Sequence, residues 1–370
     1  MTDTSHAVSL AVNGIDYGGW LDTSISAGIE RQCRDFTVGI TWRWPGADVP
    51  RRVKQGDKCL VRIGQDLVLT GYVFGTPIRY DDQSISLAIG GRSMTADVVD
   101  CAADNRPSQW RNTSILNIVK ALAAPYGIAV ISEADAGLSL ADHMVDPGET
   151  AFESIDRLLR MSRLLSTDDA YGRLVIAEPG SAGRASDRLE RGYNIKAGEA
   201  SLDFSDVFSE YVCKGQRSGT DSDFGPSASE VEARVTDDRI ARRRTLVLNE
   251  SGQMTTEIAT KRVSWERESR VSKALETRYE VQGWRQANGD LWRHNQIVRV
   301  VDPVIGFDRD MLISEIEYHE SEERGTVTSM TVAPPEGFMP DPPEPERRAK
   351  KAKGKKGDAF EYLLPPNWEK

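Results

Sequence analysis

The chain has 370 residues, a formal net charge of −10 and only four histidines. This length has room for about two to four domains, since globular domains usually hold about 100–200 residues. The last thirty residues are net basic, so the acidity is concentrated in residues 1–340; an acidic body argues against specific nucleic-acid binding, because phosphate contacts need clustered lysine and arginine.

Neither the N-terminus nor the cysteines indicate secretion or a metal site. The first six residues hold no signal-peptide pattern, and no segment approaches about 18 uninterrupted apolar residues, so we expect a soluble protein without membrane insertion. Cys33, Cys59, Cys101 and Cys213 lie far apart, with no Cys-x-x-Cys pair and no neighbouring histidine. We therefore expect neither metal, cofactor nor disulfide, and a reducing cytoplasm during assembly.

Residues 1–99 show the period-two alternation of β-strands. Val8–Val12 and Ile15–Tyr17 flank Asn13-Gly14, a pair that tolerates the positive φ angles of a tight hairpin. Alternating stretches at 59–64 and 84–89 each place one face on a core. We predict a first antiparallel β-barrel domain, or a sandwich, over 1–99.

The pattern becomes helical near residue 100. Ile115, Ile118 and Leu122 recur at helical spacing after a cap at Asn112 or Thr113. A second helix opens with the capping-box spacing of residues 150–153 and is followed by a strand at 173–177. Residues 100–187 are predicted to form an α+β domain with two helices and a strand hairpin.

The remaining chain returns to strands around an insertion. We predict a second β-barrel domain from 188–215 and 284–339, with short strands at 202–204 and 211–213. The segment 216–283 is predicted to be inserted into it, with a mobile polar loop over 218–238, a strand at 245–248 and a polar helix within 254–275. Residues 340–346 are rich in proline and acidic residues and residues 347–356 form a basic run. We therefore predict that 340–370 is a disordered tail, which is either a solvated terminus or an electrostatic hook.

One internal similarity connects the two β regions. The strand pattern of residues 58–89 recurs in the same order over residues 296–330. The match is one of pattern more than of identity, and β-hairpins also resemble one another by chance. Duplication of one barrel and chance resemblance therefore both stay open.

No catalytic motif appears in the sequence. Phosphate-binding glycine loops, a Gly-x-Ser-x-Gly elbow and a calcium loop are missing, and His319-Glu320 lacks the second histidine of a zinc protease. Carboxylate pairs remain available among 57 Asp and Glu, and a glycoside hydrolase needs only two. The main expectation is no enzymatic activity; the alternative is a peptidoglycan-binding or peptidoglycan-hydrolysing protein acting through 100–185 or the loop 216–238.

Two tryptophans stand either side of Asn288-Gly289. Trp284 and Trp292 are interpreted either as the cover of a hairpin base, which buries large areas and fixes register, or as interface anchors, because tryptophan is enriched at hot spots. The sequence favours the first interpretation.

The run Gly283-Trp284, Gly289-Asp-Leu-Trp292 and Asn295 resembles the baseplate hub proteins of Mu-like contractile-tailed bacteriophages. Further pieces agree in order, at 90–103, 109–110, 124–127, 208–215 and 333–338. The candidate structural or interface anchors within these pieces are Trp284, Trp292, Asn295, Trp110, Asp97 and Asp100. The resemblance covers about residues 8–340.

The resemblance implies a structural protein of the virion tail baseplate that forms a ring-shaped homotrimer. Two similar barrels in each of three chains would offer six near-equivalent units, so that a sixfold tail tube can sit on a threefold cell-puncturing spike. The implied partners are further copies of the chain, the spike protein, tail tube or adaptor proteins and surrounding baseplate proteins.

Overall fold

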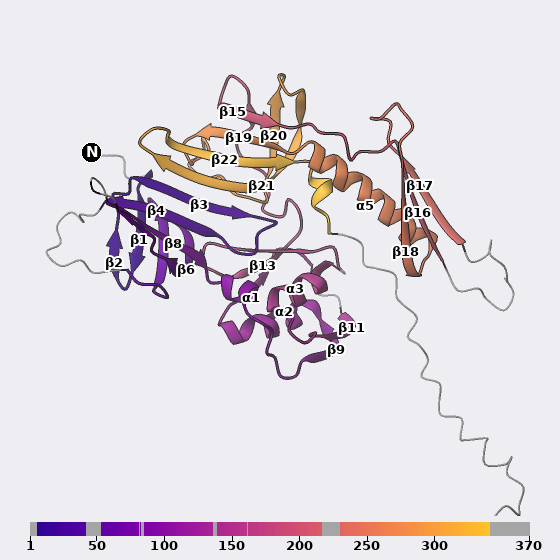
Figure 1. Cartoon of the computed structure of the whole chain (residues 1–370), viewed down its shortest axis with the longest axis horizontal. Coiled ribbons are helices and arrows are strands. Elements are labelled where there is room, and N and C mark those ends of the chain that lie inside the picture. The colour runs from indigo at the N-terminus through magenta and orange to yellow at the C-terminus, as the bar shows by residue number, and fades with distance from the viewer. Residues whose placement is uncertain are drawn as a thin grey trace, which may run out of the picture.

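The computed structural model describes residues 6–41, 53–80, 82, 85–135, 139–160, 162–216 and 230–340. The predicted tail beyond Pro340 and the first part of the predicted mobile loop, up to residue 229, lie outside these residues. Strands predominate over helices, which confirms the expectation of a mainly β protein. Figure 1 shows one large sheet, an α+β domain beneath it, and a helix and small sheet to one side.

The large sheet has fourteen strands drawn from two regions of the chain. The N-terminal region supplies β1 (Val8–Val12), β2 (Ile15–Tyr17), β3 (Asp22–Gly28), β4 (Asp35–Thr41), β5 (Lys58–Ile63), β6 (Asp66–Gly75), β7 (Ile78–Tyr80) and β8 (Ile85–Ser93). The C-terminal region supplies β14 (Leu189–Glu190), β15 (Ile195–Ala200), β19 (Thr277–Gln282), β20 (Ile297–Asp302), β21 (Phe307–Ser321) and β22 (Gly325–Ala333).

These two regions repeat one order of strand pairing. Strands β3, β4, β5, β6 and β8 lie side by side in the order β3-β4-β8-β6-β5, and β15, β19, β20, β21 and β22 lie in the corresponding order β15-β19-β22-β21-β20. All of these pairs are antiparallel in both regions. Strands β8 and β22 each have nine residues, and β6 with β7 spans 66–80, the length of the 15-residue β21. We call these units the first and second repeats; the similarity of 58–89 to 296–330 is thus also one of topology.

The repeats are joined edge to edge through β3 and β21. Strand β21 pairs with β20 over residues 307–312 and with β3 over 315–321, and an irregularity between Ile313 and Glu315 marks the change of partner. Because β21 continues into the other repeat, the described strands close neither predicted barrel and instead form one continuous path. One hydrophobic core spans both repeats, with Leu10, Val61 and Leu69 from the first and Val281, Val298 and Met330 from the second.

The α+β domain follows β8. Its elements are α1 (Ala96–Asp100), β9 (Gln109–Ser114), α2 (Ile115–Ala123), η2 (Ala124–Tyr126), β10 (Val130–Ser132), β11 (Ser139–Met144), α3 (Ala151–Arg160), β12 (Leu165–Asp168) and β13 (Leu174–Ala177). The capping box of α3 is confirmed: the Thr150 N–H donates to Glu153 Oε2 at 2.8 Å, and the Glu153 N–H to Thr150 Oγ1 at 3.1 Å. Helix α2 is capped by Ser114 and not by Asn112 or Thr113, because β9 continues to Ser114.

An inserted domain interrupts the second repeat between β15 and β19. Strands β16 (Glu210–Gln216), β17 (Glu230–Thr236) and β18 (Thr245–Gln253) pack against α5 (Thr256–Ala274), and η3 (Pro335–Phe338) lies against the same helix. Strand β17 lies within the predicted loop 218–238; its alternation of Val231 and Ala233 is short and surrounded by polar residues. The strand predicted at 202–204 is wrong, because Leu202 has a φ of 48°, outside the extended region.

Candidate functional site

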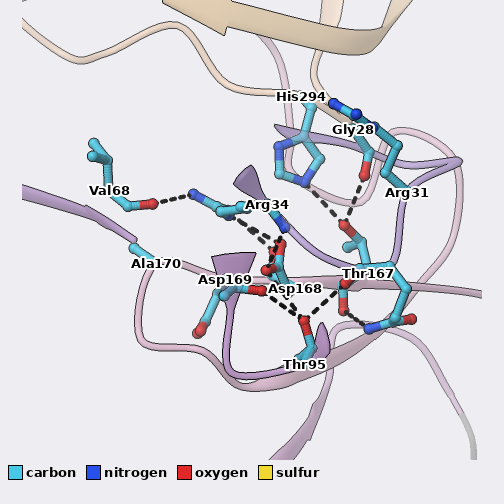
Figure 2. Close-up of polar contacts among 12 residues, drawn as sticks. Gly28, Arg31, Arg34, Val68, Thr95, Thr167, Asp168, Asp169, Ala170 and His294 are labelled. Atoms are coloured by element: carbon cyan, nitrogen blue, oxygen red, sulfur yellow. Dashed lines mark hydrogen bonds and ion pairs between the residues drawn. The ribbon is translucent and has the colours of Figure 1, made fainter. Parts of the chain in front are cut away.

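Three parts of the fold meet around a buried ion pair, which we call the junction (Figure 2). Arg34 follows β3 in the turn to β4, and Asp168 ends β12 of the α+β domain. The Arg34 Nε donates to Asp168 Oδ1 at 3.0 Å and the Arg34 backbone N–H donates to Asp168 Oδ2 at 3.0 Å. The guanidinium also donates to the Val68 carbonyl at 2.9 Å and to the Asp168 carbonyl at 3.1 Å. Arg34 therefore binds the Asp168 carboxylate through both its backbone N–H and its side chain.

Further polar bonds enclose this carboxylate. Thr95 Oγ1 lies 3.4 Å from Asp168 Oδ2 and donates to the Gln32 carbonyl at 3.1 Å. Gln32 Nε2 in turn donates to the Thr167 carbonyl at 3.1 Å. The Asp168 side chain is 1% exposed and that of Arg34 13% exposed. Burial raises the pKa of the Asp168 carboxyl, and the neighbouring Arg34 charge opposes that shift.

The second repeat reaches the junction through His294. Thr167 Oγ1 donates to the Gly28 carbonyl at 3.0 Å and lies 3.3 Å from His294 Nε2. Burial lowers the pKa of His294 well below its ordinary value, and the charges of Arg34 and Arg293 act in the same direction. A neutral histidine, a threonine and an ion pair thus fix the positions of both repeats and the α+β domain relative to one another.

Trp284 and Trp292 are both buried in the core that the repeats share. The Trp284 indole N–H donates to the Val327 carbonyl at 3.0 Å and to the His319 carbonyl at 3.1 Å. Its ring meets Tyr318 edge to face, and the Tyr318 hydroxyl donates to the Trp292 carbonyl. This geometry matches the packing interpretation of the two tryptophans. Their role as interface anchors stays a prediction.

Asn295 holds the end of the α+β domain to the second repeat. Its Oδ1 accepts from the Gly180 N–H at 2.7 Å, and its Nδ2 donates to the Glu178 carbonyl and to Ser181 Oγ, each at 3.0 Å. The residue is buried and has a φ of 61°, a conformation that asparagine tolerates better than most residues. The sequence identified Asn295 only through the family resemblance.

The other candidate anchors lie away from this junction. Trp110, on β9, is half-buried and packs with His143 at a ring distance of 6.1 Å. Asp100, at the end of α1, forms an ion pair with Arg92 at 2.6 Å. Asp97 lies in the first turn of the same helix, where its carbonyl accepts from the N–H of the C-cap residue Cys101 at 3.1 Å. The structure does not bring these three residues together with Trp284, Trp292 and Asn295.

Several strand edges in the large sheet have no second strand partner among the described residues, and two of them correspond to strands of the joint between the repeats. One is the outer edge of β15, which pairs only with β19; the other is the edge of segment 74–80 opposite β8. Phe74 and Ile78 on the second edge are 45% and 61% exposed. An unpaired edge presents backbone donors and acceptors that another chain can complete. Neither edge was identified from the sequence, because β15 and β7 carry few large apolar residues.

The described part of the chain has no group of three or more His, Cys, Asp and Glu able to hold a metal ion. None of its helices is long and apolar enough to cross a membrane. The arrangement at the junction holds segments together, since each polar atom named there bonds to protein.

Three family models match successive parts of the chain. They are the N-terminal domain of a Mu phage baseplate assembly protein GpP-like family over residues 7–93, the second domain of baseplate hub protein gp44-like over 95–178, and the fourth domain of Mu phage baseplate assembly protein GpP over 255–341. Together these models cover the first repeat, the α+β domain and the second repeat from β19 onward, and they leave out β14 and β15.

Individual relatives agree with these models. The chain is 30% identical to the baseplate hub protein gp44 of Escherichia phage Mu over 355 residues, which is 94% of this chain and 92% of the relative. The crystal structure of the 43 kDa tail protein of prophage MuSo2 from Shewanella oneidensis matches with a TM-score of 0.79 and 31% identity, covering 91% of this chain and 100% of that one. A tail protein from Neisseria meningitidis shares the fold, with a TM-score of 0.73 and 20% identity over 92% and 99% of the two chains. None of these names gives a catalytic activity.

Proposed function

The chain belongs to the baseplate hub family of Mu-like phages, and from this premise we propose that three copies form a ring that adapts a sixfold tail tube to a threefold spike. A hub of this family lies in the tail baseplate of the virion. The ring, its symmetry and its partners are the proposal. The observation that supports them most directly is the repeated strand order, together with the unpaired edges of β15 and of segment 74–80.

The joint inside the chain suggests how two chains join. The β3–β4 pair of the first repeat corresponds to the β15–β19 pair of the second, and β21 corresponds to segment 66–80. Within the chain, β3 pairs with residues 315–321 of β21, which correspond to residues 74–80. The counterpart of β3 is β15, whose outer edge has no strand partner among the described residues. We infer that β15 of one chain pairs with residues 74–80 of the next chain. Each chain then takes part in two identical joints, through β15 in one and through residues 74–80 in the other.

Transferring the register of the inner joint gives specific neighbours. Gly198 lies opposite Ile78, and Glu199 lies opposite Pro77. The Pro77 carbonyl accepts from the Ala88 N–H at 3.0 Å, so the backbone of Pro77 faces β8, where its lack of an N–H does not affect the unpaired edge. The backbone N–H and C=O groups of the residues on either side of Pro77 face the unpaired edge. Pairing there also covers the exposed side chains of Phe74 and Ile78.

Such a joint is heterologous, because one surface of a subunit meets a different surface of the next. A heterologous joint closes into a ring when the rotation between subunits fits and otherwise continues as a filament. Inside the chain, the β3·β21 joint relates two near-equivalent repeats. Six such joints, three within chains and three between them, would close a ring with two repeats per chain.

A cysteine pair tests the joint. In a Cys101→Ser background, which removes the exposed native thiol, Glu199→Cys combined with Pro77→Cys is expected to form disulfides between chains under mild oxidation. A non-reducing gel should then show covalent species up to a trimer and no further. The control pair, Glu199→Cys with the exposed Tyr171→Cys, should not cross-link. A ladder that stops at the dimer, or equal cross-linking of the control, contradicts the joint.

Two measurements separate the hub from a cell-wall enzyme. Light scattering of the purified protein should give three times the 41.0 kDa mass of one chain, and a cell-wall clearing assay should show no hydrolysis. A monomer that clears cell walls would instead support the peptidoglycan-active alternative.

A further inference from the structure

The joint inside the chain continues beyond its paired strands into the turn after β3. Ile29, in that turn, is buried and donates its N–H to the Ser314 carbonyl at 2.9 Å. It belongs to a small apolar cluster with Leu312 of β21, Ala333 at the end of β22 and Phe338 of η3. The connection that follows β3 is thus packed against the segment that follows β22.

The equivalence of the repeats extends this contact to the joint between chains. There β15 corresponds to β3, and β8 corresponds to β22. The connection after β15 begins with residues 201–209 and leads into the inserted domain, and the segment after β8 is α1. Because β3 is antiparallel to β21, β15 is antiparallel to segment 74–80 in the proposed joint, which brings residues 201–209 to the Phe74 end of that segment. The start of the inserted domain in one chain therefore lies against α1 of the next chain.

Within a single chain these two regions are far apart. In Figure 1, α5 and its small sheet lie at the opposite side of the molecule from β6 and β8. A contact between them consequently needs a second copy of the chain.

On one side of the contact is a group of residues that we call the α1 surface: Phe74, Arg92, Asp97, Asp100 and Asp104. Phe74 is 45% exposed, and the Arg92 guanidinium lies over its ring at 5.6 Å from the centroid. Arg92 pairs with Asp100 at 2.6 Å, which connects the open strand edge to the end of α1. Asp100 and Asp104 are exposed and Asp97 is half-buried. With three carboxylates and one guanidinium, the α1 surface is net negative.

Two of these aspartates lie close to the same hydroxyl group. The Tyr126 hydroxyl donates to the Ala102 carbonyl at 2.7 Å. Burial raises the pKa of Tyr126, and the nearby charges of Cys101, Asp104 and Asp97 raise it further. Negative charge is therefore concentrated beside the C-terminal end of α1.

On the other side of the contact is the part of the inserted domain that we call the near end, residues 201–209 with the β17–β18 turn 237–244. The two segments pack on each other, since Ile240 of the turn lies in one apolar cluster with Phe204. Leu202 is 37% exposed. The near end thus offers an apolar side chain beside the strand that enters the proposed joint.

The near end also carries positive charge. Residues 237–244 hold four arginines and two aspartates, and residues 201–209 hold two aspartates. Arg242 and Arg243 are adjacent in the chain and both exposed. Positive charge is therefore concentrated at these two residues, and it is opposite in sign to the α1 surface.

We propose that the near end of one chain docks on the α1 surface of the next chain, with Arg242 and Arg243 facing the aspartates and Leu202 beside Phe74. The inference rests on the proposed ring. The partner is a second copy of this chain, and the contact joins an inserted domain to an α+β domain outside the large sheet. Charges at the rim of an interface act mainly on the rate of association and on its salt dependence.

A thiol cross-link to a native cysteine tests the contact. Cys101 follows α1 directly and is exposed, whereas Cys33 is half-buried and the other two cysteines are buried. The full chain with Arg242→Cys, treated with a short bis-maleimide, is expected to give covalent species up to a trimer on a denaturing gel. Cys101→Ser should remove them. Lys261→Cys is the matched control, because this exposed lysine lies on α5 away from the near end, and it should not cross-link.

Charge reversal gives a second, independent measurement. Arg242→Glu combined with Arg243→Glu is expected to slow association into the trimer about tenfold at low salt, and Asp97→Arg with Asp104→Arg in the same chain should restore most of the rate. The difference should largely disappear at about 0.5 M salt, where exposed charges are screened.

The matched control for charge reversal changes two other exposed lysines of the inserted domain. Lys214→Glu combined with Lys261→Glu alters the net charge by the same amount but lies away from the near end. This variant should associate at the rate of the unchanged chain.

The outcomes separate the docking from the ring. A trimeric mass with no link between Arg242→Cys and Cys101, with links confined to single chains, or with equal linking of Lys261→Cys overturns the docking and leaves the ring standing. Equal slowing by the two charge reversals also overturns it. A monomeric mass of the unchanged chain overturns the ring and the docking together.

Discussion

Replacing Arg34 by methionine is expected to weaken the junction strongly. The Asp168 carboxylate is almost fully buried. Without the guanidinium it keeps the Arg34 backbone N–H at 3.0 Å and the side-chain hydroxyls of Ser93 and Thr95, and none of these groups carries a charge. Removing one partner of a buried ion pair typically costs about 3–5 kcal/mol, because the other charge remains buried without compensation. We expect Arg34→Met to lower the free energy of local opening at β12 by an amount in this range.

The loss should depend on pH in a defined direction. Burial already raises the pKa of Asp168 above 3.8, and removal of Arg34 raises it further. The folded variant then binds a proton at a pH where the unfolded chain does not, so its stability increases as pH falls toward the raised pKa. The penalty of Arg34→Met is therefore larger at pH 8 than at pH 5.

Hydrogen exchange of the β12 amides, followed by mass spectrometry at both pH values, measures this opening without requiring two-state unfolding of a multidomain chain. Asp168→Asn in the Arg34→Met background should restore most of the loss, because the buried charge is gone. Arg31→Met is the matched control, since the Arg31–Asp35 pair in the same turn is 43% and 39% exposed and such pairs contribute about 0–1 kcal/mol. A penalty equal to that control, or one that does not change with pH, refutes the reasoning.

Three other side chains give predictions of the same kind. Trp292→Ala should cost roughly 3–5 kcal/mol and give insoluble protein, because a buried indole leaves a cavity; a soluble variant of trimeric mass would show that this side chain is peripheral. Asn295→Gly and Asn295→Ala both lose the three side-chain hydrogen bonds, but only glycine tolerates the φ of 61° without strain. Asn295→Ala should therefore be less stable than Asn295→Gly by about 1 kcal/mol in thermal unfolding. Equal stabilities of the two variants would contradict this. His294 is buried and its pKa is lowered, so as pH falls below about 6.5 the unfolded state binds a proton at this histidine before the folded state does. The free energy of unfolding should therefore fall by up to about 1.4 kcal/mol per pH unit. Thermal unfolding of His294→Gln between pH 7.5 and 5 should lack this pH dependence, and the same dependence in both proteins would exclude His294 as the cause.

Local patterns in the sequence predicted local structure well. The capping box at Thr150 and the alternation before Asn13-Gly14 each depend on residues a few positions apart, and both appear in the structure as expected. The similarity of 58–89 to 296–330 was also visible, because the hairpins β5–β6 and β20–β21 keep their apolar alternation. The pairing that joins the repeats was not visible. It brings Ser24 Oγ within 2.8 Å of Glu317 Oε1 across 293 positions, and polar residues on paired edges carry no signal of their partner.

The junction was missed for a different reason. The chain has 47 Lys and Arg and 57 Asp and Glu, and no spacing distinguishes Arg34 and Asp168 from the rest. Their importance comes from burial, which depends on the packing of the α+β domain against the turn after β3. Asn295 was identified only through a resemblance, since its positive φ and its bonds to residues 178–181 follow from the tertiary structure.

The position of the junction has a consequence for the proposed ring. Six near-equivalent repeats need the same sheet geometry in each, yet only the first repeat of a chain has the α+β domain packed against its β3–β4 turn. The corresponding connection of the second repeat, after β15, holds the inserted domain instead. A buried ion pair with four hydrogen bonds from Arg34 fixes the orientation of the first attachment, whereas α5 and η3 fix the second through Ser272 and Trp265. The two repeats can therefore keep equivalent strands while presenting different domains, which is what a sixfold-to-threefold adaptor requires.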